Sequence, residues 1–286
     1  MPGKRVRELF VIGLLLSPAC GPPVQTRVFV EPATARRYTV LAREGHDPRA
    51  PSAVLFVLHP YATDPSVLLH NYGLGRRVAG TRDWLVVVPE GTPDSTGRLS
   101  WNASAACCGA GPARPDDVRY LRLVLEDVRR RAAIDPARVH AFGESNGGFM
   151  AHRWACAGGG ELRGIVSIAG AAPGPDDPPC TPAGPVSVLE VHGDRDEMVR
   201  YQGGRSARGR YPAARESVEM WRALDRCDPL PRTSRERRLL LFEPLQVESW
   251  SCPSARVALW TVAGGGHQLR LRLWTDAMID FLDAGR

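Results

Sequence analysis

The sequence predicts an α/β fold, a single domain in which helices cover both faces of a mostly parallel central sheet. Two observations favour this class. Short runs of apolar residues alternate with segments of helical period, and turns rich in glycine and proline separate them. The 286 residues, 43% of them hydrophobic, are also enough for one substantial core, and no shift in composition divides the chain.

Several segments are predicted to be strands because their apolar runs are short and end at turn residues. They are residues 36–41, 53–58, 85–88, 138–142, 165–168, 186–191 and 257–262. Helices are predicted over residues 117–133, 149–156, 215–225 and 274–282. In the first of these helices, Val118, Leu121 and Leu125 fall on one stripe that can face the sheet.

The net charge of +6 comes mainly from arginine. These arginines are scattered along the chain and are not interleaved with aromatic residues, as they would be in a nucleic-acid-binding surface. We therefore expect no nucleic-acid partner.

The first twenty residues have the pattern of an export signal. A basic start that includes Lys4 precedes an apolar run at 9–16, which is too short to span a bilayer. Small residues before Cys20 are typical of lipoprotein processing, so two outcomes stay open: plain secretion, or a lipid anchor on Cys20 that attaches the protein to the cell envelope. In both cases we expect an extracellular or periplasmic protein. The predicted division is an export signal at 1–19, a short linker at 20–35 and the folded domain at 36–286.

The cysteines agree with export. Without Cys20 an even set remains, as expected for a disulfide-bonded protein in an oxidising compartment: Cys107, Cys108, Cys156, Cys180, Cys227 and Cys252. Their spacing is not that of a zinc site. We expect no metal and no organic cofactor.

The segment GESNGG at 143–148 carries the strongest indication of chemistry. It lies between a predicted strand and a predicted helix, where a sharp turn flanked by glycines projects Ser145 toward a base. The backbone N–H of the next residue, Asn146, can then donate to an oxyanion. This strand–turn–helix pattern predicts the nucleophile of an α/β-hydrolase.

The general base is expected after Ser145 in the chain. His152 lies on the helix of the nucleophile itself, too near Ser145 for an acid to come between them, and His192 ends a strand, where we expect a local hydrogen bond. His267 follows a glycine-rich loop after the last strand, and such a loop can lower an imidazole onto the serine. His267 is therefore the predicted base.

The acid that orients the base is expected in the loop after the strand at 186–191. Asp194 and Asp196 both lie there, and spacing alone does not choose between them. The other aspartate is expected to close the turn.

A second oxyanion donor is expected from the loop after the strand at 53–58. Pro60 in this loop has no N–H, so the donor must be Tyr61 or a neighbour.

These features together resemble the exported polyhydroxybutyrate depolymerase and feruloyl esterase-like family of α/β-hydrolases. The matching segments keep the family's order: LHPY at 58–61, PEG at 89–91, WN at 101–102 with CC at 107–108, DDV at 116–118, GESNGG at 143–148, HGDRD at 192–196 with Tyr201, and GGGH at 264–267.

The resemblance implies roles for several further residues. The family pattern His-Gly-x-x-Asp implies Asp196 as the acid, and a Cys227–Cys252 bond is implied between the acid and the histidine. Trp101 and the double cysteine are implied near the substrate groove, and we expect Tyr201 to add aromatic surface there. The pairing of the other four cysteines stays open. The sequence departs from the family at Pro60 and Ala62, where the family usually has glycine.

The predicted function is an exported serine carboxylic-ester hydrolase that works through an acyl-enzyme. The substrate is expected to be a small or oligomeric ester, of the feruloyl or acetyl type or of short hydroxyalkanoates. Two alternatives stay open: an acyltransferase with the same triad, and a non-catalytic wall-binding protein on the same fold.

Overall fold

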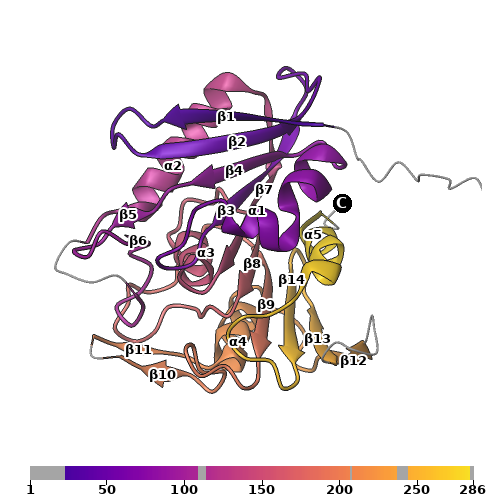
Figure 1. The fold of residues 1–286 in the computed structure, drawn as a ribbon. Helices are drawn as coiled ribbons and strands as arrows, with labels where there is room; N and C mark the ends of the chain where they lie inside the picture. Colours follow the sequence, from indigo (N-terminus) through magenta and orange to yellow (C-terminus); the bar gives the residue numbers. More distant parts are fainter. Residues whose placement is uncertain (1–22, 109–113, 207, 237–243, 284–286) are drawn as a thin grey trace, which may run out of the picture.

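The computed structural model describes residues 23–108, 114–206, 208–236 and 244–283, and they form one layered α/β unit (Figure 1). Its centre is a ten-stranded sheet with the order β1-β2-β4-β3-β7-β8-β9-β14-β13-β12. The strands β4, β3, β7, β8, β9 and β14 pair in parallel, and the pairs at both edges are antiparallel. The predicted α/β fold with a mostly parallel sheet is confirmed.

The strands of the large sheet are β1 (Val24–Val30), β2 (Arg37–Arg43), β3 (Ser52–Leu58), β4 (Leu85–Pro89), β7 (Ile134–Glu144), β8 (Gly164–Ile168), β9 (Ser187–Gly193), β12 (Arg232–Glu236), β13 (Leu245–Ser251) and β14 (Arg256–Val262). Two small hairpins pair β5 (Thr92–Pro93) with β6 (Leu99–Ser100) and β10 (Gly204–Arg205) with β11 (Arg210–Tyr211). The helices are α1 (Val67–Tyr72), α2 (Asp117–Arg131), α3 (Asn146–Cys156), α4 (Ala214–Leu224) and α5 (Thr275–Asp283), with short helical turns η1 (Gly75–Gly80) and η2 (Arg272–Trp274).

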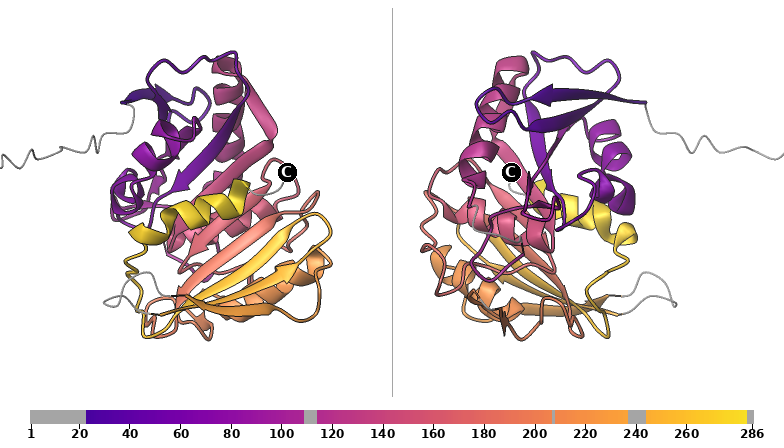
Figure 2. Two further views of the ribbon diagram at one scale, coloured as in Figure 1. Left: turned by 90° about the vertical axis from the view of Figure 1, so that its right-hand side faces the viewer. Right: turned by 60° about the vertical axis from the view of Figure 1, so that its left-hand side comes forward.

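Helices cover both faces of the sheet and create two separate cores. The helices α2, α3 and α4 pack on one face, and α1, η1 and α5 pack on the other, as the turned views show (Figure 2). Right-handed crossovers between parallel strands place helices in this way. Because β3 and β4 are buried on both sides, all their residues except Ser52 are apolar.

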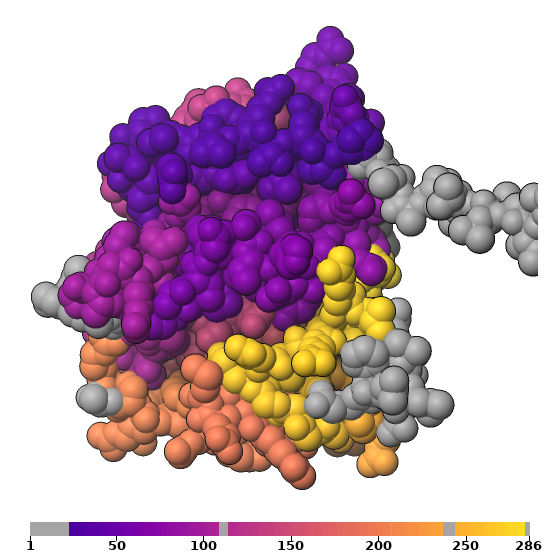
Figure 3. Space-filling model, in the orientation of Figure 1, coloured from indigo at the N-terminus to yellow at the C-terminus, as the bar shows by residue number. Residues whose placement is uncertain are grey.

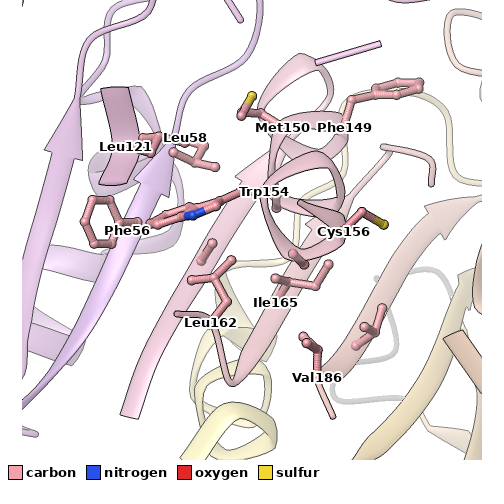
Figure 4. Close-up of a cluster of buried hydrophobic side chains, with 14 of the residues drawn as sticks. Phe56, Leu58, Leu121, Phe149, Met150, Trp154, Cys156, Leu162, Ile165 and Val186 are labelled. Atoms are coloured by element: carbon pink, nitrogen blue, oxygen red, sulfur yellow. The ribbon is translucent and has the colours of Figure 1, made fainter. Parts of the chain in front are cut away.

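Trp154 of α3 is a central contact of the first core. Its ring points from the helix toward β3 and meets Phe56 edge to face, with ring centroids 4.8 Å apart, while Leu58 and Leu121 lie close by (Figure 4). Trp154 is only 1% exposed. This aromatic therefore packs the core, and it is not free to bind a substrate.

One domain boundary needs correction. Residues 20–35 were expected to be a linker, but Val24–Val30 forms the edge strand β1 and pairs along its whole length with β2. The expectation failed because the edge strand is half exposed, with Val28 62% and Val30 52% accessible, so it lacks a continuous apolar run. The antiparallel strands β12 and β13 were missed at the other edge for the same reason.

The predicted export signal at 1–19 and Cys20 lie outside the described residues. None of the helices in the described part of the chain is long and apolar enough to cross a membrane.

The six cysteines that follow Cys20 form three disulfides in the structure. The bond between Cys227 and Cys252, which the family resemblance implied, is present and joins the end of α4 to the turn after β13. The pairing that the sequence left open is Cys107 with Cys108 and Cys156 with Cys180.

His140 makes the stability of the fold sensitive to acid. It is 2% exposed, its ring stacks on Trp84, and neither ring nitrogen has a hydrogen-bond partner within the described structure. Burial lowers the pKa of His140 to about 4. As the pH falls below about 6.5, the unfolded chain takes up a proton here and the folded chain does not, so folding free energy is lost between pH 6.5 and 4.

We predict that His140→Phe removes this acid-sensitive contribution. Urea unfolding of both proteins at pH 7.5 and pH 4.5 should show that wild type loses roughly 2 kcal/mol more stability on acidification than the variant does. Any fixed packing cost of the larger ring cancels in this comparison. Equal losses would mean that His140 is protonated in the folded protein at pH 4.5.

Candidate active site

The residues singled out by sequence come together at one edge of the sheet. The strands β3, β7, β9 and β14 run parallel, so the loops that follow them share the carboxyl-terminal edge. Those loops carry Tyr61, Ser145, Asp196 and His267, in that order. Ligands of open α/β sheets bind at such an edge.

Ser145 occupies the sharp turn between β7 and α3 with φ of 54° and ψ of −120°. This left-handed backbone is costly for a residue with a side chain, and it is typical of a strained functional position. The Ser145 N–H donates to the carbonyl of Ile168 at 2.7 Å, and the Ser145 carbonyl accepts from Phe149 N–H at 3.0 Å. The neighbouring strand β8 and the helix α3 therefore both hold the turn in place.

The glycines around Ser145 are needed for steric reasons. A Cβ on Gly147 would lie 1.9 Å from the carbonyl oxygen of Leu58, and a Cβ on Gly143 would lie 2.1 Å from the carbonyl oxygen of Gly147. The turn thus packs directly against the end of β3, and only glycine permits this approach.

A continuous hydrogen-bonded row joins the serine, a histidine and an aspartate. The Nε2 atom of His267 lies 3.0 Å from Ser145 Oγ, and its Nδ1 atom lies 2.7 Å from Asp196 Oδ2. Ser145 and Asp196 are 8% and 5% exposed. With Nδ1–H donating to the carboxylate, Nε2 is free to accept the serine proton, which is the arrangement of a nucleophile activated by a base.

The structure separates the two aspartates that spacing left open. Asp196 meets His267, and its Oδ1 atom accepts from the N–H groups of Met198 and Val199, both at 2.9 Å. Burial raises the pKa of Asp196, but hydrogen bonds from His192 and His267 outweigh it and hold the pKa below the ordinary value. Asp194 instead accepts from Gly264 N–H at 2.7 Å and closes the contact between the two loops.

Two backbone N–H groups, one of Tyr61 in the cavity wall and one of Asn146 next to Ser145, make no hydrogen bond within the described residues. Among the described residues, no carbonyl or side chain accepts a hydrogen bond from the N–H of Asn146 or of Tyr61. The alternative donor beside Tyr61 is occupied, because Ala62 N–H donates to the Leu99 carbonyl at 2.9 Å. Ala62 has φ of 61°, a backbone conformation that explains the glycine usual at this position in the family.

The loop that carries Tyr61 is anchored by His59. Its Nε2 atom accepts from Gly91 N–H at 2.9 Å, so Nδ1 carries the hydrogen and donates to the Pro60 carbonyl at 2.7 Å. Burial lowers the pKa of His59 to about 4, which keeps the ring neutral at neutral pH. Sequence reasoning missed this role, although a histidine that ends an apolar strand indicates a buried ring.

Trp101 and Tyr201 do not contact the cavity at Ser145, in contrast to the expectation. Trp101 is 1% exposed, and its indole N–H donates to the His59 carbonyl at 3.0 Å. Its backbone N–H and carbonyl bind the side chain of Asn146 at 2.7 and 3.0 Å. Tyr201 packs against His192 and its hydroxyl bonds Thr261. Both side chains hold the loops of the site in place.

A cavity of about 1020 Å³ opens at Ser145 and His267. On the surface, the yellow C-terminal segment lies between the purple residues of the N-terminal half and the salmon residues of the segment near 200 (Figure 3). The apolar part of the wall comes from Pro60, Tyr61, Val67, Met198, Val199, Leu269, Leu271 and Leu273, and the polar part from Thr63, Asn71, Glu144, Gln268, Arg270 and Arg272. Cys108 of the double cysteine also lines it.

Glu144 adds a carboxyl group to the wall directly beside Ser145. It accepts a hydrogen bond from the Tyr72 hydroxyl at 2.9 Å, and burial raises the pKa of Glu144. In the described part of the chain, no group of three histidine, cysteine, aspartate or glutamate side chains could hold a metal ion.

We predict that Gly147→Ala disrupts the turn. The new Cβ would overlap backbone and not a flexible side chain, so β3 and α3 must move apart, at a cost of about 3 kcal/mol. Gly184→Ala is the matched control because its Cβ meets nothing within 4 Å. Urea unfolding should show a large loss for the first variant and a change within about 0.5 kcal/mol for the second. Similar stabilities of the two variants would contradict the packing at Gly147.

No family model matches the chain. Its curated relatives include feruloyl esterase B of Piromyces equi, 28% identical over 183 residues, which are 59% of this chain and 31% of that protein. A proposed esterase of Nocardia uniformis subsp. tsuyamanensis, NocK, is 27% identical over 86% of this chain and 76% of its own length. Feruloyl esterase C of Emericella nidulans is 26% identical over 66% of this chain and 65% of its own. The chain thus spans less than a third of the first relative and just under two thirds of the last.

Solved structures with the same fold include an acetyl xylan esterase from Aspergillus awamori, with a TM-score of 0.62 and 12% identity. That match covers 91% of this chain and 99% of the other. A Bacillus cereus carboxylesterase matches with a TM-score of 0.56 and 15% identity, over 90% and 97% of the two chains. The chain therefore has the α/β-hydrolase fold of these esterases, and its sequence is similar to feruloyl esterases.

Proposed function

We propose that the protein is an exported serine carboxylic-ester hydrolase with Ser145 as nucleophile, His267 as general base and Asp196 as the orienting acid. The observation that carries this proposal is the position of His267, whose two ring nitrogens lie within hydrogen-bond distance of Ser145 Oγ and Asp196 Oδ2. The strained backbone of Ser145 supports the proposal, since such strain clusters at active sites.

In the first half of the reaction, Ser145 Oγ attacks the ester carbonyl while His267 Nε2 takes the serine proton. The carbonyl oxygen becomes an oxyanion, for which the free N–H groups of Tyr61 and Asn146 are the proposed donors. Asn146 is the first residue of α3, so the helix N-terminus adds favourable charge there. His267 then protonates the departing alcohol, and an acyl-serine remains.

In the second half, water takes the place of the alcohol. His267 removes a proton from the water, the resulting hydroxide attacks the acyl carbonyl, and the C–O bond to Ser145 breaks as His267 returns the proton to Oγ. The carboxylic acid leaves and the free serine is restored. Asp196 stays ionised throughout and stabilises the imidazolium form of His267.

The proposed substrates are feruloyl- or acetyl-type esters of soluble oligomers. Two of the relatives cited above are feruloyl esterases by name, and the cavity beside Ser145 has the volume to take a bulky acyl group. Its apolar wall suits the acyl part, and its polar groups suit a hydroxylated alcohol. Short hydroxyalkanoate esters are the second candidate, and they fit the same wall.

Export is supported by the disulfides. All six cysteines in the described residues are paired, and such bonds persist in oxidising compartments. A lipid anchor on Cys20 remains part of the proposal for the N-terminus.

The direct test compares the purified mature protein with Ser145→Ala on p-nitrophenyl acetate, p-nitrophenyl butyrate, methyl ferulate and hydroxybutyrate oligomers. We expect Ser145→Ala to lower kcat by at least about 10³-fold, because the acyl-enzyme cannot form. Ser254→Ala, an exposed serine far along the chain, is the control and should keep full activity.

Equal activity of wild type and Ser145→Ala would sink the assignment of the nucleophile. A wild type that is inactive on every ester would instead favour a binding role. Adding a simple alcohol and looking for the transesterified product separates a hydrolase from an acyltransferase.

A further inference from the structure

A row of buried polar side chains continues beyond the triad into the first core. It passes from Asp196 to His192, then to Glu190 and His152, and ends at the indole of Trp221 on α4. Glu190, His152 and Trp221 are each 0% exposed, and His192 is 1% exposed. The reaction steps derived above use none of these four side chains.

The hydrogen of His152 can be placed from its neighbours. The indole N–H of Trp221 is a donor only, and it points at His152 Nδ1 at 2.9 Å. Nδ1 must therefore accept, so His152 is neutral and its hydrogen lies on Nε2, which donates to Glu190 Oε2 at 3.1 Å. His152 thus brings no positive charge to Glu190.

His192 has acceptors at both ring nitrogens. Its Nδ1 atom lies 3.1 Å from Glu190 Oε1. Its Nε2 atom lies 2.7 Å from the Val199 carbonyl oxygen and 3.4 Å from Asp196 Oδ2. With Glu190 ionised, a neutral imidazole would aim a lone pair at one of these acceptors, so both nitrogens carry hydrogen.

We propose that His192 is a permanent imidazolium held between Glu190 and Asp196, and that this charge is a positioning element that sets the pH at which His267 can act as a base. The claim about His267 rests on the proposed function, whereas the claim that His192 is an imidazolium does not. Burial disfavours the cation, but hydrogen bonds with Asp196 and Glu190 outweigh it and raise the pKa of His192 to about 9. Glu190 stays ionised in return, because hydrogen bonds from His152 and His192 outweigh its burial and lower its pKa.

The charges in the buried row determine how the His192 imidazolium affects His267. Glu190 and Asp196 contribute two negative charges and His192 one positive charge, so the buried row carries one net negative charge while His267 is neutral. His192 and His267 share a single oxygen, Asp196 Oδ2. The cation therefore opposes protonation of His267, and part of the pull of Asp196 on the His267 proton is cancelled.

Among the described residues, the groups that face His192 from the other packed elements carry no charge; on the His267 side, Arg270 and Arg272 of the cavity wall are charged and stay unchanged in the test below. Tyr201 presents its ring to His192, and its hydroxyl bonds Thr261 on β14. On α3, the facing group is the neutral His152, and on α4 it is the uncharged indole of Trp221. On the side of His267, the facing carboxyl is Glu144, which is half-buried beside Ser145 and bonded to Tyr72.

The kinetic test is the pH profile of kcat/KM for His192→Gln with p-nitrophenyl acetate. We expect the acid limb to move up by about half to one pH unit, because the lost cation is nearer to His267 than Glu190 is. The acid limb is expected to move to higher pH whether Glu190 stays ionised in the variant or takes up a proton. His46→Gln, which pairs with Asp83 away from the site, should leave the limb in place.

A purely structural role for His192 predicts a different profile. In that case His192→Gln would lower kcat/KM by one factor at every pH, and the acid limb would coincide with that of wild type. That outcome would overturn the proposal.

The second test uses the wild-type chain, so it does not depend on the folding of a variant or on ester turnover. Nuclear magnetic resonance of protein with ¹⁵N-labelled histidine distinguishes a ring with two N–H groups from a neutral ring. Of the seven histidines, one should stay doubly protonated at pH 8, and this pattern should vanish in Glu190→Gln, where the side-chain NH₂ would face His192 Nδ1. Only neutral rings at pH 8 would refute the imidazolium. An imidazolium in a chain that cleaves no ester would refute the proposed function alone.

Discussion

Parallel pairing at the centre of the sheet is the constraint on which both the site and the cores depend. Ser145 and His267 are 122 residues apart, and Asp196 and His267 are 71 apart, yet each pair is joined by a hydrogen bond. They meet because β7, β9 and β14 end at the same edge. The crossovers that parallel pairing requires also place helices on both faces of the sheet and so create its two cores. The geometry of the site is thus held by the whole buried interior.

The loops at this edge are held in place by hydrogen bonds from buried side chains and by close backbone packing. Gly147 lies against the end of β3, His59 joins the loop that carries Tyr61 to Gly91, and the Asn146 side chain bonds the backbone of Trp101. These contacts carry the strained conformation of Ser145, which isolated chain segments would not keep. In the proposed mechanism, the unbonded N–H groups of Tyr61 and Asn146 can then receive an oxyanion without rearrangement of these loops.

Sequence reasoning predicted the features that depend on local pattern. Continuous apolar runs identified the central strands, and the glycine-flanked serine between strand and helix identified the elbow. Strand β1 at one edge and strand β13 beside the other edge were not predicted, because one-sided burial gives a pattern that tertiary pairing alone distinguishes from a loop. Trp101 was expected to line the substrate groove but is buried. The sequence does not distinguish an aromatic side chain that lines a groove from one that packs underneath it. Asp194 and Asp196 could not be separated, since two positions in one loop differ only in where the folded loop points them.

Glu190 is an acidic residue inside an otherwise buried strand, and this departure from the apolar pattern indicates a role other than packing. A carboxylate inside the buried strand β9 is costly to desolvate, and an apolar residue of similar volume is often at least as stable in such a position. Packing alone therefore does not account for an acid there. In this fold Glu190 is matched on one side by the neutral His152 and on the other by His192, whose second nitrogen reaches the Asp196 carboxylate. The charge on buried Glu190 is thereby linked, through His192 and Asp196, to the protonation of His267, so a residue deep in the sheet acts on the proposed chemistry at its edge.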